Sequence, residues 1–519
     1  MSVRSKAEPR LSLKGFINRS GTIEEAKSQS LAAKRQRYRS KSFTQNKPMQ
    51  IPILRLGQEY HSADLVELND SLVTHTANPG LIRRDLLRIS ESKAALEAIT
   101  AETLAVYCEA AAELFMHADL PCGDETQGPD DYVESLSALT RLPHTLVRMN
   151  MGKIYAAMSQ IRTVIGGLTR GIPLEMFDRG LTSVDGLDVN FYPATDSLGV
   201  SLPSNAPAVN SLWLPALVMK IPVLLKPGRE DPFTPLRIVQ AMIQAGFPKE
   251  AFGYYPTTHE GGDTLLTSCG AGISFGSDVT VKKYAPFKNI QVHGTGRSKI
   301  LIGDDFMDKW HDHLDVFVTS IAANGGRSCI NTSSILVPSG RDEIAEAIAS
   351  ELAKIEPLAR DDENALLCGF ANTDLANGID GMIEGLLEDE PGAVDVTAQF
   401  RNGDRKVEAF DQTYLRPTLI ACDDRSHSLA NTEFMFPFAS IVEMPQDEML
   451  GHIGETLVVS AFTENKEWSQ ELMTSHLIER LNLGPYPTNR VQWEQPHEGN
   501  LFEFLYRRRA IQGNLAVAM

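Results

Sequence analysis

Cysteine is scarce in this sequence of 519 residues, and its six copies form no recognisable set. They lie far apart, with neither a CxxC pair nor a His/Cys cluster at ligand spacing, so we expect no disulfide framework and no metal site. Long hydrophobic runs are also missing. No stretch approaches about 18 uninterrupted apolar residues, and we therefore expect no membrane span. The six positions are Cys108, Cys122, Cys269, Cys329, Cys368 and Cys422.

The GxGxxG fingerprint of a standard dinucleotide-binding turn is absent as well. Gly270-Ala-Gly272 and Gly294-Thr-Gly296 come nearest, and both stand in the wrong context. What remains is an ordinary composition, 42% hydrophobic with a mean hydropathy of −0.17. Because the chain is too long for a single core, this composition predicts two or three globular domains.

The formal net charge of −18 conceals a basic N-terminal segment. Residues 1–50 hold twelve Lys or Arg against three Glu, while the rest of the chain is strongly acidic. The segment is Ser-rich and poor in large apolar residues, so we expect a flexible arm. The interpretation that we favour is that the arm packs on the acidic body or on a partner subunit. An organelle-targeting peptide is the second alternative, and contact with nucleic acid is the third. A cytoplasmic protein without a nucleic-acid ligand is the main expectation, and organelle targeting through the arm is the alternative.

Short β-branched or Leu-rich runs alternate with helix-compatible stretches of about 12 residues, which predicts βα units and parallel sheets. Two α/β domains joined near residue 293 are the economical arrangement. Strands are expected at 51–56, 198–202, 221–226, 272–277, 333–338, 414–421, 440–442 and 456–462, and helices at 85–120, 209–220, 234–245, 309–323, 341–354 and 465–481. The alternating aromatic residues at 501–506 indicate an edge strand or a subunit contact.

Cys329 stands in the run Asn324-Gly-Gly-Arg-Ser-Cys-Ile-Asn-Thr332, directly before the strand-like Ser333–Pro338. Glycines on one side and a β-branched run on the other are typical of a loop that presents a nucleophile at the mouth of a cleft. A lone cysteine is also a common inert core residue, so the motif alone leaves that alternative open.

Five separated segments stand out over roughly residues 190–490. They are Pro203-Ser-Asn-Ala-Pro207, Val223-Leu-Leu-Lys-Pro227, Phe275-Gly-Ser277, Asn324–Thr332 and Asn431-Thr-Glu-Phe-Met-Phe-Pro-Phe438. In this order the five segments together resemble the aldehyde dehydrogenase superfamily. The resemblance implies an α/β fold with a cofactor domain and a catalytic domain, each on a parallel sheet, and an additional oligomerisation β element. It divides the chain into an arm (1–50), a helical front end with the NAD(P)-binding domain (51–292), a catalytic domain (293–482) and an oligomerisation segment (483–519).

The same resemblance implies the catalytic roles. The Cys329 thiolate would add to an aldehyde carbonyl, while the Cys329 N–H and the Asn205 side-chain amide hold the oxygen that becomes negative. Asn205 also suits a plain turn between two prolines.

NAD or NADP is the cofactor that the resemblance implies. Arg229, in Gly228-Arg-Glu230, could pair with a 2′-phosphate, which favours NADP slightly. A slip of one residue would put Glu230 in that place and favour NAD. The other implied contacts are Lys226 to the adenosine ribose, Gly276 and Ser277 to the pyrophosphate, and Glu433 to the nicotinamide ribose.

His293 marks a departure from the family pattern. Many members carry a glutamate ahead of a Gly-Gly-Lys-Ser-like turn, and alignment on Gly296-Arg-Ser298 puts His293 in its place. That glutamate activates the water that hydrolyses the thioester. Either His293 takes the role as a base, or CoA accepts the acyl group, as in the CoA-acylating branch, whose reverse reaction reduces acyl-CoA to an aldehyde. A third alternative is a structural histidine in a catalytically silent member that serves as a binding subunit.

The expected partners are a small aldehyde or acyl thioester and further copies of the chain, as a homodimer or homotetramer in which a β-hairpin extends a neighbour's sheet. The walls of the substrate pocket are expected around Met149–Leu168 and in the C-terminal tail. Neither region contains a cluster of charged residues that would indicate an anionic or a cationic substrate. His497, in the tail, suits a satisfied loop histidine better than a residue at the substrate entrance.

Overall fold

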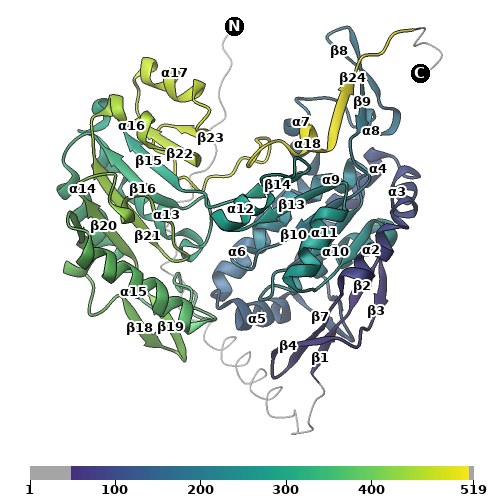
Figure 1. The fold of residues 1–519 in the computed structure, drawn as a ribbon, viewed down its shortest axis with the longest axis horizontal. Coiled ribbons are helices and arrows are strands. Elements are labelled where there is room, and N and C mark those ends of the chain that lie inside the picture. Colours follow the sequence, from purple (N-terminus) through teal and green to yellow (C-terminus); the bar gives the residue numbers. More distant parts are fainter. Residues whose placement is uncertain (1–47, 514–519) are drawn as a thin grey trace, which may run out of the picture. The chain divides into compact units, whose positions relative to one another are not determined.

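Two seven-stranded sheets, each mostly parallel, organise the chain in a computed structural model that describes residues 48–513. Helices cover both sheets, which makes two α/β lobes (Figure 1). The predicted α/β fold with two parallel sheets is thereby confirmed. The predicted basic arm falls almost wholly on residues 1–47, which lie outside the described residues, as do residues 514–519.

The sheet of the first lobe runs in the order β14-β13-β10-β11-β12-β2-β3, parallel from β14 to β12 and antiparallel at β2 and β3. The chain builds from β10 through β11 to β12, then crosses back to place β13 and β14 on the other side of β10. The strand order therefore reverses between β10 and β13, where open α/β sheets bind ligands at the carboxyl ends of their strands. The strands are β2 (Ile53–Arg55), β3 (Gln58–Tyr60), β10 (Leu198–Ser201), β11 (Val223–Lys226), β12 (Phe252–Tyr254), β13 (Ala271–Phe275) and β14 (Ile290–His293).

Helix α10 shows how local sequence sets the helix bounds in this lobe. The Asp231 carboxylate accepts a hydrogen bond from the Thr234 N–H at 2.9 Å in the first turn, and Gly246 ends the helix at φ 120°. The helices of the lobe are α2 (Pro79–Leu86), α3 (Ile89–Glu97), α4 (Ala101–His117), α5 (Pro129–Thr140), α6 (His144–Ser159), α7 (Ile161–Leu168), α8 (Met176–Arg179), α9 (Leu214–Val218), α10 (Phe233–Ala245), α11 (His259–Ser268) and α12 (Asp278–Tyr284).

The second sheet runs in the order β17-β20-β21-β16-β15-β22-β23, parallel except at β17. Its central strands are buried along their whole length, as parallel strands covered on both faces are. The strands are β15 (Ser298–Ile302), β16 (Thr332–Val337), β17 (Ala393–Asp395), β20 (Thr418–Cys422), β21 (Phe438–Glu443), β22 (Thr456–Phe462) and β23 (Ile478–Leu483), and the helices are α13 (Leu314–Ala322), α14 (Arg341–Leu352), α15 (Thr373–Asp389), α16 (Gln446–His452) and α17 (Lys466–Thr474).

The first sheet ends at His293 and the second begins at Ser298, close to the predicted junction; the four-segment division itself stays a prediction. Four small sheets complete the described chain, in the orders β1-β5-β4, β24-β9-β8, β6-β7 and β18-β19. Their elements are β1 (Met49–Ile51), β4 (Leu65–Asn69), β5 (Leu72–His75), β6 (Leu120–Cys122), β7 (Glu125–Gln127), β8 (Leu181–Val184), β9 (Leu187–Pro193), β18 (Lys406–Ala409), β19 (Gln412–Leu415) and β24 (Tyr506–Arg509), and α18 (Leu501–Leu505) precedes β24.

Two element predictions near the C-terminus differ from the structure. The helix expected at 465–481 ends at Thr474, because the chain turns there and pairs as β23 with β22. The edge strand indicated at 501–506 is helix α18 followed by β24. Asn500 caps that helix by accepting hydrogen bonds from Phe502 and Glu503, and this local bond outweighs the alternating aromatic pattern. The helix expected at 209–220 is also interrupted, since it splits into a 3₁₀ turn and the short α9.

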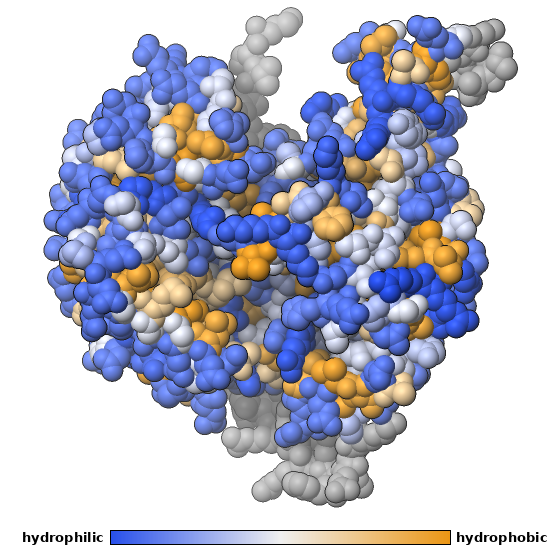
Figure 2. Space-filling model, in the orientation of Figure 1, coloured by the Kyte–Doolittle hydropathy of each residue, from blue (hydrophilic) through white to orange (hydrophobic). Residues whose placement is uncertain are grey.

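The surface shows no extended apolar face in the view of Figure 2, where hydrophobic residues form small patches between hydrophilic ones. Within residues 48–513 no helix is both long enough and apolar enough to cross a membrane.

Arg237 is a buried charge in the first lobe that holds the end of α4. Its guanidinium donates to the carbonyls of Phe115, Ala118 and Gln127 at 3.0, 2.8 and 2.8 Å. Two of these carbonyls belong to the last turn of α4 and would otherwise lack a partner. Arg237 thus joins α10, α4 and β7 through hydrogen bonds.

We expect Arg237→Leu to lower the free energy of unfolding by about 3 kcal/mol, because three buried carbonyls lose their donor. Urea denaturation followed by circular dichroism measures this. The control is Arg88→Leu, which removes an exposed ion pair to Glu91 and should change stability little. Equal effects of the two substitutions would contradict the structural role assigned to Arg237.

Candidate active site

The turn before Cys329 needs its small residues. Asn324, Gly325 and Gly326 follow one another with left-handed backbone, at φ 54°, 65° and 70°. A Cβ on Gly325 would lie 2.2 Å from the Cys368 sulfur, and one on Gly326 would overlap a facing backbone. The Asn-Gly-Gly part of the motif is therefore required by this turn and not only by chemistry.

Hydrogen bonds tie the cysteine loop to the first lobe. The Arg327 guanidinium donates to the Thr140 carbonyl at the end of α5, at 2.8 Å, and to the Gly369 carbonyl at 2.5 Å. The Asn324 side chain accepts from the Asn150 amide of α6 at 2.7 Å. Because these partners are buried, the loop that carries the thiol is fixed to both lobes.

The Cys329 side chain is partly exposed and packs against the cluster of Ile330, Leu457 and Val458. Its carbonyl accepts a hydrogen bond from the Ser298 hydroxyl at 2.9 Å. The thiol is thus neither sealed in a core nor free on the surface, and it lies over the start of β15. The role of Cys329 as a nucleophile stays a prediction.

Charges around the thiol oppose one another. Burial raises the pKa of the Cys329 thiol, and the carboxylates of Glu433 and Glu498 raise this pKa further, while the Arg480 charge lowers it. A thiolate here depends on positive charge supplied close by, and Arg480 is the described side chain that supplies it.

Asn205, predicted as an oxyanion donor, lies next to the cysteine loop. It follows β10, and its side-chain amide donates to the Arg327 carbonyl at 2.7 Å, two residues before Cys329. The amide has a second N–H to offer. The structure therefore brings Asn205 and Cys329 together, although the oxyanion role stays a prediction.

His293 forms a pair that the sequence did not reveal. At the carboxyl end of β14, its Nδ1 lies 2.5 Å from a carboxylate oxygen of Glu498, and its ring stacks on Phe275 with centroids 4.8 Å apart. His293 is buried and Glu498 is largely so. Carboxylate and stack together fix the ring, which leaves Nε2 as the nitrogen able to exchange a proton.

Glu433, predicted at the nicotinamide ribose, is held by the turn that precedes β15. Its carboxylate accepts from the Arg297 N–H at 2.7 Å, and burial raises its pKa to about 7. The neighbouring Lys299 is fully buried, and burial lowers its pKa to about 7. Lys299 donates to the Arg297 carbonyl at 2.6 Å and to Thr456 at 3.0 Å.

Lys226 and Arg229, predicted as cofactor contacts, line one cavity at the carboxyl end of β11, together with Thr258 and His259 at the start of α11. Burial lowers the pKa of Lys226, and the charge of Glu230 opposes this shift. Both Arg229 and Glu230 thus lie near Lys226, so the position does not decide between NADP and NAD.

Gly276 and Ser277 follow β13 on the far side of the point where strand order reverses. The Gly276 N–H donates to the His293 carbonyl at 3.0 Å, and Ser277 is the N-cap residue of α12. A Cβ on Gly276 would lie 2.3 Å from the Thr280 hydroxyl, so the glycine is required by close packing. These residues and Lys226 lie at the same edge of the sheet, on either side of β10.

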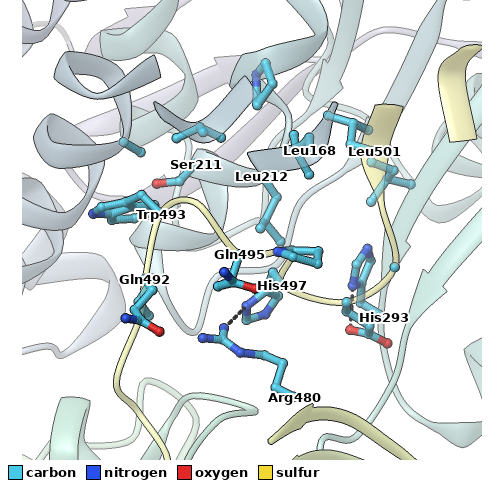
Figure 3. A pocket seen from close by; sticks show the side chains of 18 of the residues that line it. Leu168, Ser211, Leu212, His293, Arg480, Gln492, Trp493, Gln495, His497 and Leu501 are labelled. Atoms are coloured by element: carbon cyan, nitrogen blue, oxygen red, sulfur yellow. Dashed lines mark hydrogen bonds and ion pairs between the residues drawn. The ribbon is translucent and has the colours of Figure 1, made fainter. Parts of the chain in front are cut away.

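A cavity beside the thiol is walled by α6 and α7 on one side and by the tail on the other (Figure 3). This agrees with the predicted source of the pocket walls. Arg480 of β23 reaches into it, and its guanidinium donates to His497 Nδ1 at 2.9 Å and to the Arg490 carbonyl at 3.0 Å. His497 therefore has a hydrogen-bond partner and also lines the cavity, and burial lowers its pKa to about 3. Val491 lines the cavity and, like Cys329, packs against the cluster of Ile330, Leu457 and Val458.

Sequence reasoning missed Glu498, Arg480 and Lys299. Glu498 lies 205 residues from His293 in sequence, so no spacing rule links them. Arg480 was placed in a helix, although it belongs to strand β23. Lys299 follows the Gly-Arg-Ser turn directly, and its place in a buried strand was the one signal that could have marked it.

These features define a class of protein: two parallel-sheet lobes with a loop-borne cysteine fixed to both. Comparison with known proteins identifies the family within this class. A profile of the aldehyde dehydrogenase family matches residues 195–454, half of the chain. This chain belongs to the aldehyde dehydrogenase family, which confirms the resemblance found in the sequence.

Individual relatives are distant. A Staphylococcus haemolyticus protein with the provisional description of aldehyde dehydrogenase is 25% identical over 43% of this chain and 47% of its own length. A succinate semialdehyde dehydrogenase of Acinetobacter baylyi is 25% identical over 47% of this chain and 51% of its own length. The chain thus aligns with about half the length of these curated relatives. An indole-3-acetaldehyde dehydrogenase crystallised with NAD⁺ superposes with a TM-score of 0.72 at 16% identity, over 90% of this chain and 97% of that one, which shows the shared fold.

We expect alkylation of Cys329 by iodoacetamide to keep accelerating above pH 9, because burial and two carboxylates raise the pKa of its thiol above the ordinary value of about 8.5. Mass spectrometry of the labelled peptide over a pH series measures the rate. The other five cysteines are buried and provide an internal reference.

Glu433→Gln removes one of the two carboxylates and should speed the labelling several-fold at pH 8. A rate that levels off near pH 8 in the unaltered protein, or no acceleration in Glu433→Gln, would show that the thiol is not in the electrostatic environment described.

Proposed function

We propose that the protein oxidises an aldehyde to the carboxylic acid with a nicotinamide cofactor and water, through a thioester on Cys329. The observation that supports this most strongly is that the loop of Cys329 is hydrogen-bonded to both lobes and to Asn205, which follows β10. Glu498, which holds His293 at the end of β14, raises the pKa of the Cys329 thiol and therefore lies near it. The overall balance is aldehyde, NAD(P)⁺ and water giving acid, NAD(P)H and a proton.

In the first half-reaction the Cys329 sulfur attacks the carbonyl carbon and the carbonyl oxygen becomes negative. The free N–H of the Asn205 amide and the Cys329 backbone N–H are the donors proposed to stabilise that oxygen. The C–H hydrogen then leaves as hydride, which oxidises the adduct to a thioester. Arg480 favours the thiolate form that begins the sequence.

In the second half-reaction water is the proposed acyl acceptor. His293 Nε2 takes a proton from the water as it attacks the thioester, and Glu498 holds the ring through Nδ1 and balances the charge that forms. Collapse of the adduct expels the Cys329 thiolate. The His293 and Glu498 pair supplies the base that the family's glutamate otherwise provides, and it favours hydrolysis over transfer to CoA.

A nicotinamide dinucleotide fits the described residues. The cavity at Lys226 and Arg229 and the bare backbone at Gly276 lie at the edge where strand order reverses. Lys226 would hold the adenosine ribose and the start of α12 the pyrophosphate, and the bound group accepts the hydride. NADP is slightly favoured by Arg229, with NAD as the alternative.

We also propose a homodimer or homotetramer built through the small β24-β9-β8 sheet. Strand β8 is an edge strand of this sheet, and Val184 and Leu187 at the β8-β9 turn are exposed. An unpaired edge with exposed apolar residues favours pairing with another copy.

Cys329→Ala should abolish aldehyde-dependent NAD(P)H formation, because no other side chain can form the thioester. Cofactor binding, followed by protein fluorescence, should be retained. Turnover above the background rate in this variant would remove the proposed mechanism.

His293→Ala should slow steady-state turnover by about 10²-fold or more while a rapid burst of one NAD(P)H per site persists, because hydride transfer precedes deacylation. Glu498→Gln should show the same pattern, slowed about 10-fold. Stopped-flow absorbance measures both phases.

His311→Ala is the matched control, since this exposed histidine lies beside Glu343, away from the thiol. Unchanged steady-state rates in His293→Ala would contradict the base role. Stimulation of acyl release by CoA, but not by water, would favour the CoA-acylating alternative.

A further inference from the structure

We propose that the cavity beside Cys329 selects short aldehydes that carry a second, anionic group, a carboxylate or a phosphate, and that Arg480 binds this group. The inference rests on the proposed function, because it names the substrate class of the same site. It corrects the sequence-based view that no charge in the pocket walls identifies the substrate.

The first support is that Arg480 lacks a carboxylate partner. In the described part of the chain it makes no ion pair, although it is half-buried and burial lowers its pKa. Among the buried arginines, Arg405 pairs with three carboxylates, whereas Arg237 and Arg327 donate to three and two backbone carbonyls. A partly buried charge without a carboxylate partner favours an anionic ligand that completes it.

The second support is that the guanidinium is oriented and yet has donors left. Two of its five N–H groups are used, by His497 Nδ1 and the Arg490 carbonyl. Because His497 accepts this bond and its pKa is lowered to about 3, it is neutral and cannot balance the charge. The remaining N–H groups suit the two oxygens of a carboxylate or phosphate.

The one carboxylate among the described residues that line this cavity does not pair with Arg480. Glu498 lines the same cavity, but its carboxylate is engaged by His293 at 2.5 Å. The Cys329 thiol is neutral at rest because its pKa is raised. Figure 3 shows the amide side chains of Gln492 and Gln495 beside Arg480, where they could add hydrogen bonds to an anion.

The size of the substrate follows from the position of Arg480. Arg480 lines the cavity and its charge lowers the pKa of the Cys329 thiol, so we infer that a short chain joins the reacting carbonyl to the anion. The opposite wall is apolar, with Ile161, Val164 and Leu168. A few methylene groups between aldehyde and anion match this arrangement.

The test compares kcat/KM for aldehydes of equal length with and without the anion. The pairs are succinic semialdehyde against butanal, glutaric semialdehyde against pentanal, and 3-oxopropyl phosphate against butanal. We expect the protein to prefer at least one type of anionic aldehyde by about 10²-fold, and the carboxylate and phosphate arms identify which. In Arg480→Gln the ratio should fall close to one, with partial retention in Arg480→Lys.

Using the ratio separates substrate binding from the effect of Arg480 on the thiol, because that effect applies equally to both aldehydes of a pair. Arg490→Gln is the matched control. It removes an exposed guanidinium that lies over Tyr486 in the same segment, and it should keep the ratio of the unaltered protein. No preference for either anionic type, or an unchanged ratio in Arg480→Gln, would overturn the proposal.

A binding measurement distinguishes failure of this inference from failure of the proposed function. In Cys329→Ala, which cannot react, quenching of the cavity residue Trp493 should report succinic semialdehyde binding that weakens about 10²-fold when Arg480→Gln is added. If that loss occurs while the unaltered protein turns over no aldehyde, the anion site stands and the oxidoreductase proposal fails. Equal affinity with and without Arg480 removes the anion site.

Discussion

The left-handed turn at Asn324, Gly325 and Gly326, and the hydrogen bonds that hold it, are the constraint on which the site depends. The turn brings Cys329 over the start of β15 and leaves Arg327 free to reach carbonyls of the first lobe. A thiol on a flexible loop would spend little time facing a carbonyl. The buried bonds of Arg327 and Asn324 reduce that freedom before any substrate binds.

Around this fixed sulfur, the charged groups come from distant parts of the chain. Glu433 approaches from the turn before β21, Glu498 from the tail and Arg480 from β23. Burial and the two carboxylates raise the pKa of the thiol, and the guanidinium lowers it. The fraction of reactive thiolate therefore depends on how these effects add up. A substrate anion bound to Arg480 would change that balance, which links recognition to reactivity.

The pair of His293 and Glu498 illustrates how a family site can be rebuilt. Where the family commonly has a glutamate on the first lobe, this chain has a histidine, and the carboxylate comes from the tail. The tail segment that carries Glu498 also carries His497, Gln495 and Gln492. The carboxylate that holds His293, the histidine that accepts from Arg480 and part of the cavity wall therefore lie in one segment, and changes in it should alter several properties of the site together.

Sequence alone determined the fold class and the family, and it singled out Cys329 as the candidate nucleophile. Parallel sheets follow from buried β-branched runs that alternate with helices, and the Asn-Gly-Gly turn needs backbone angles that few residues adopt, so both leave local traces. It also placed Asn205, His293 and Lys226 at strand ends.

Tertiary structure alone decided the partners of these residues. Glu498 meets His293, and Arg480 lacks a carboxylate, because separate elements converge on one cavity, and no local pattern records which distant side chains meet. The strand that carries Arg480 was mistaken for a helix for the same reason, since its pairing with β22 is a long-range contact.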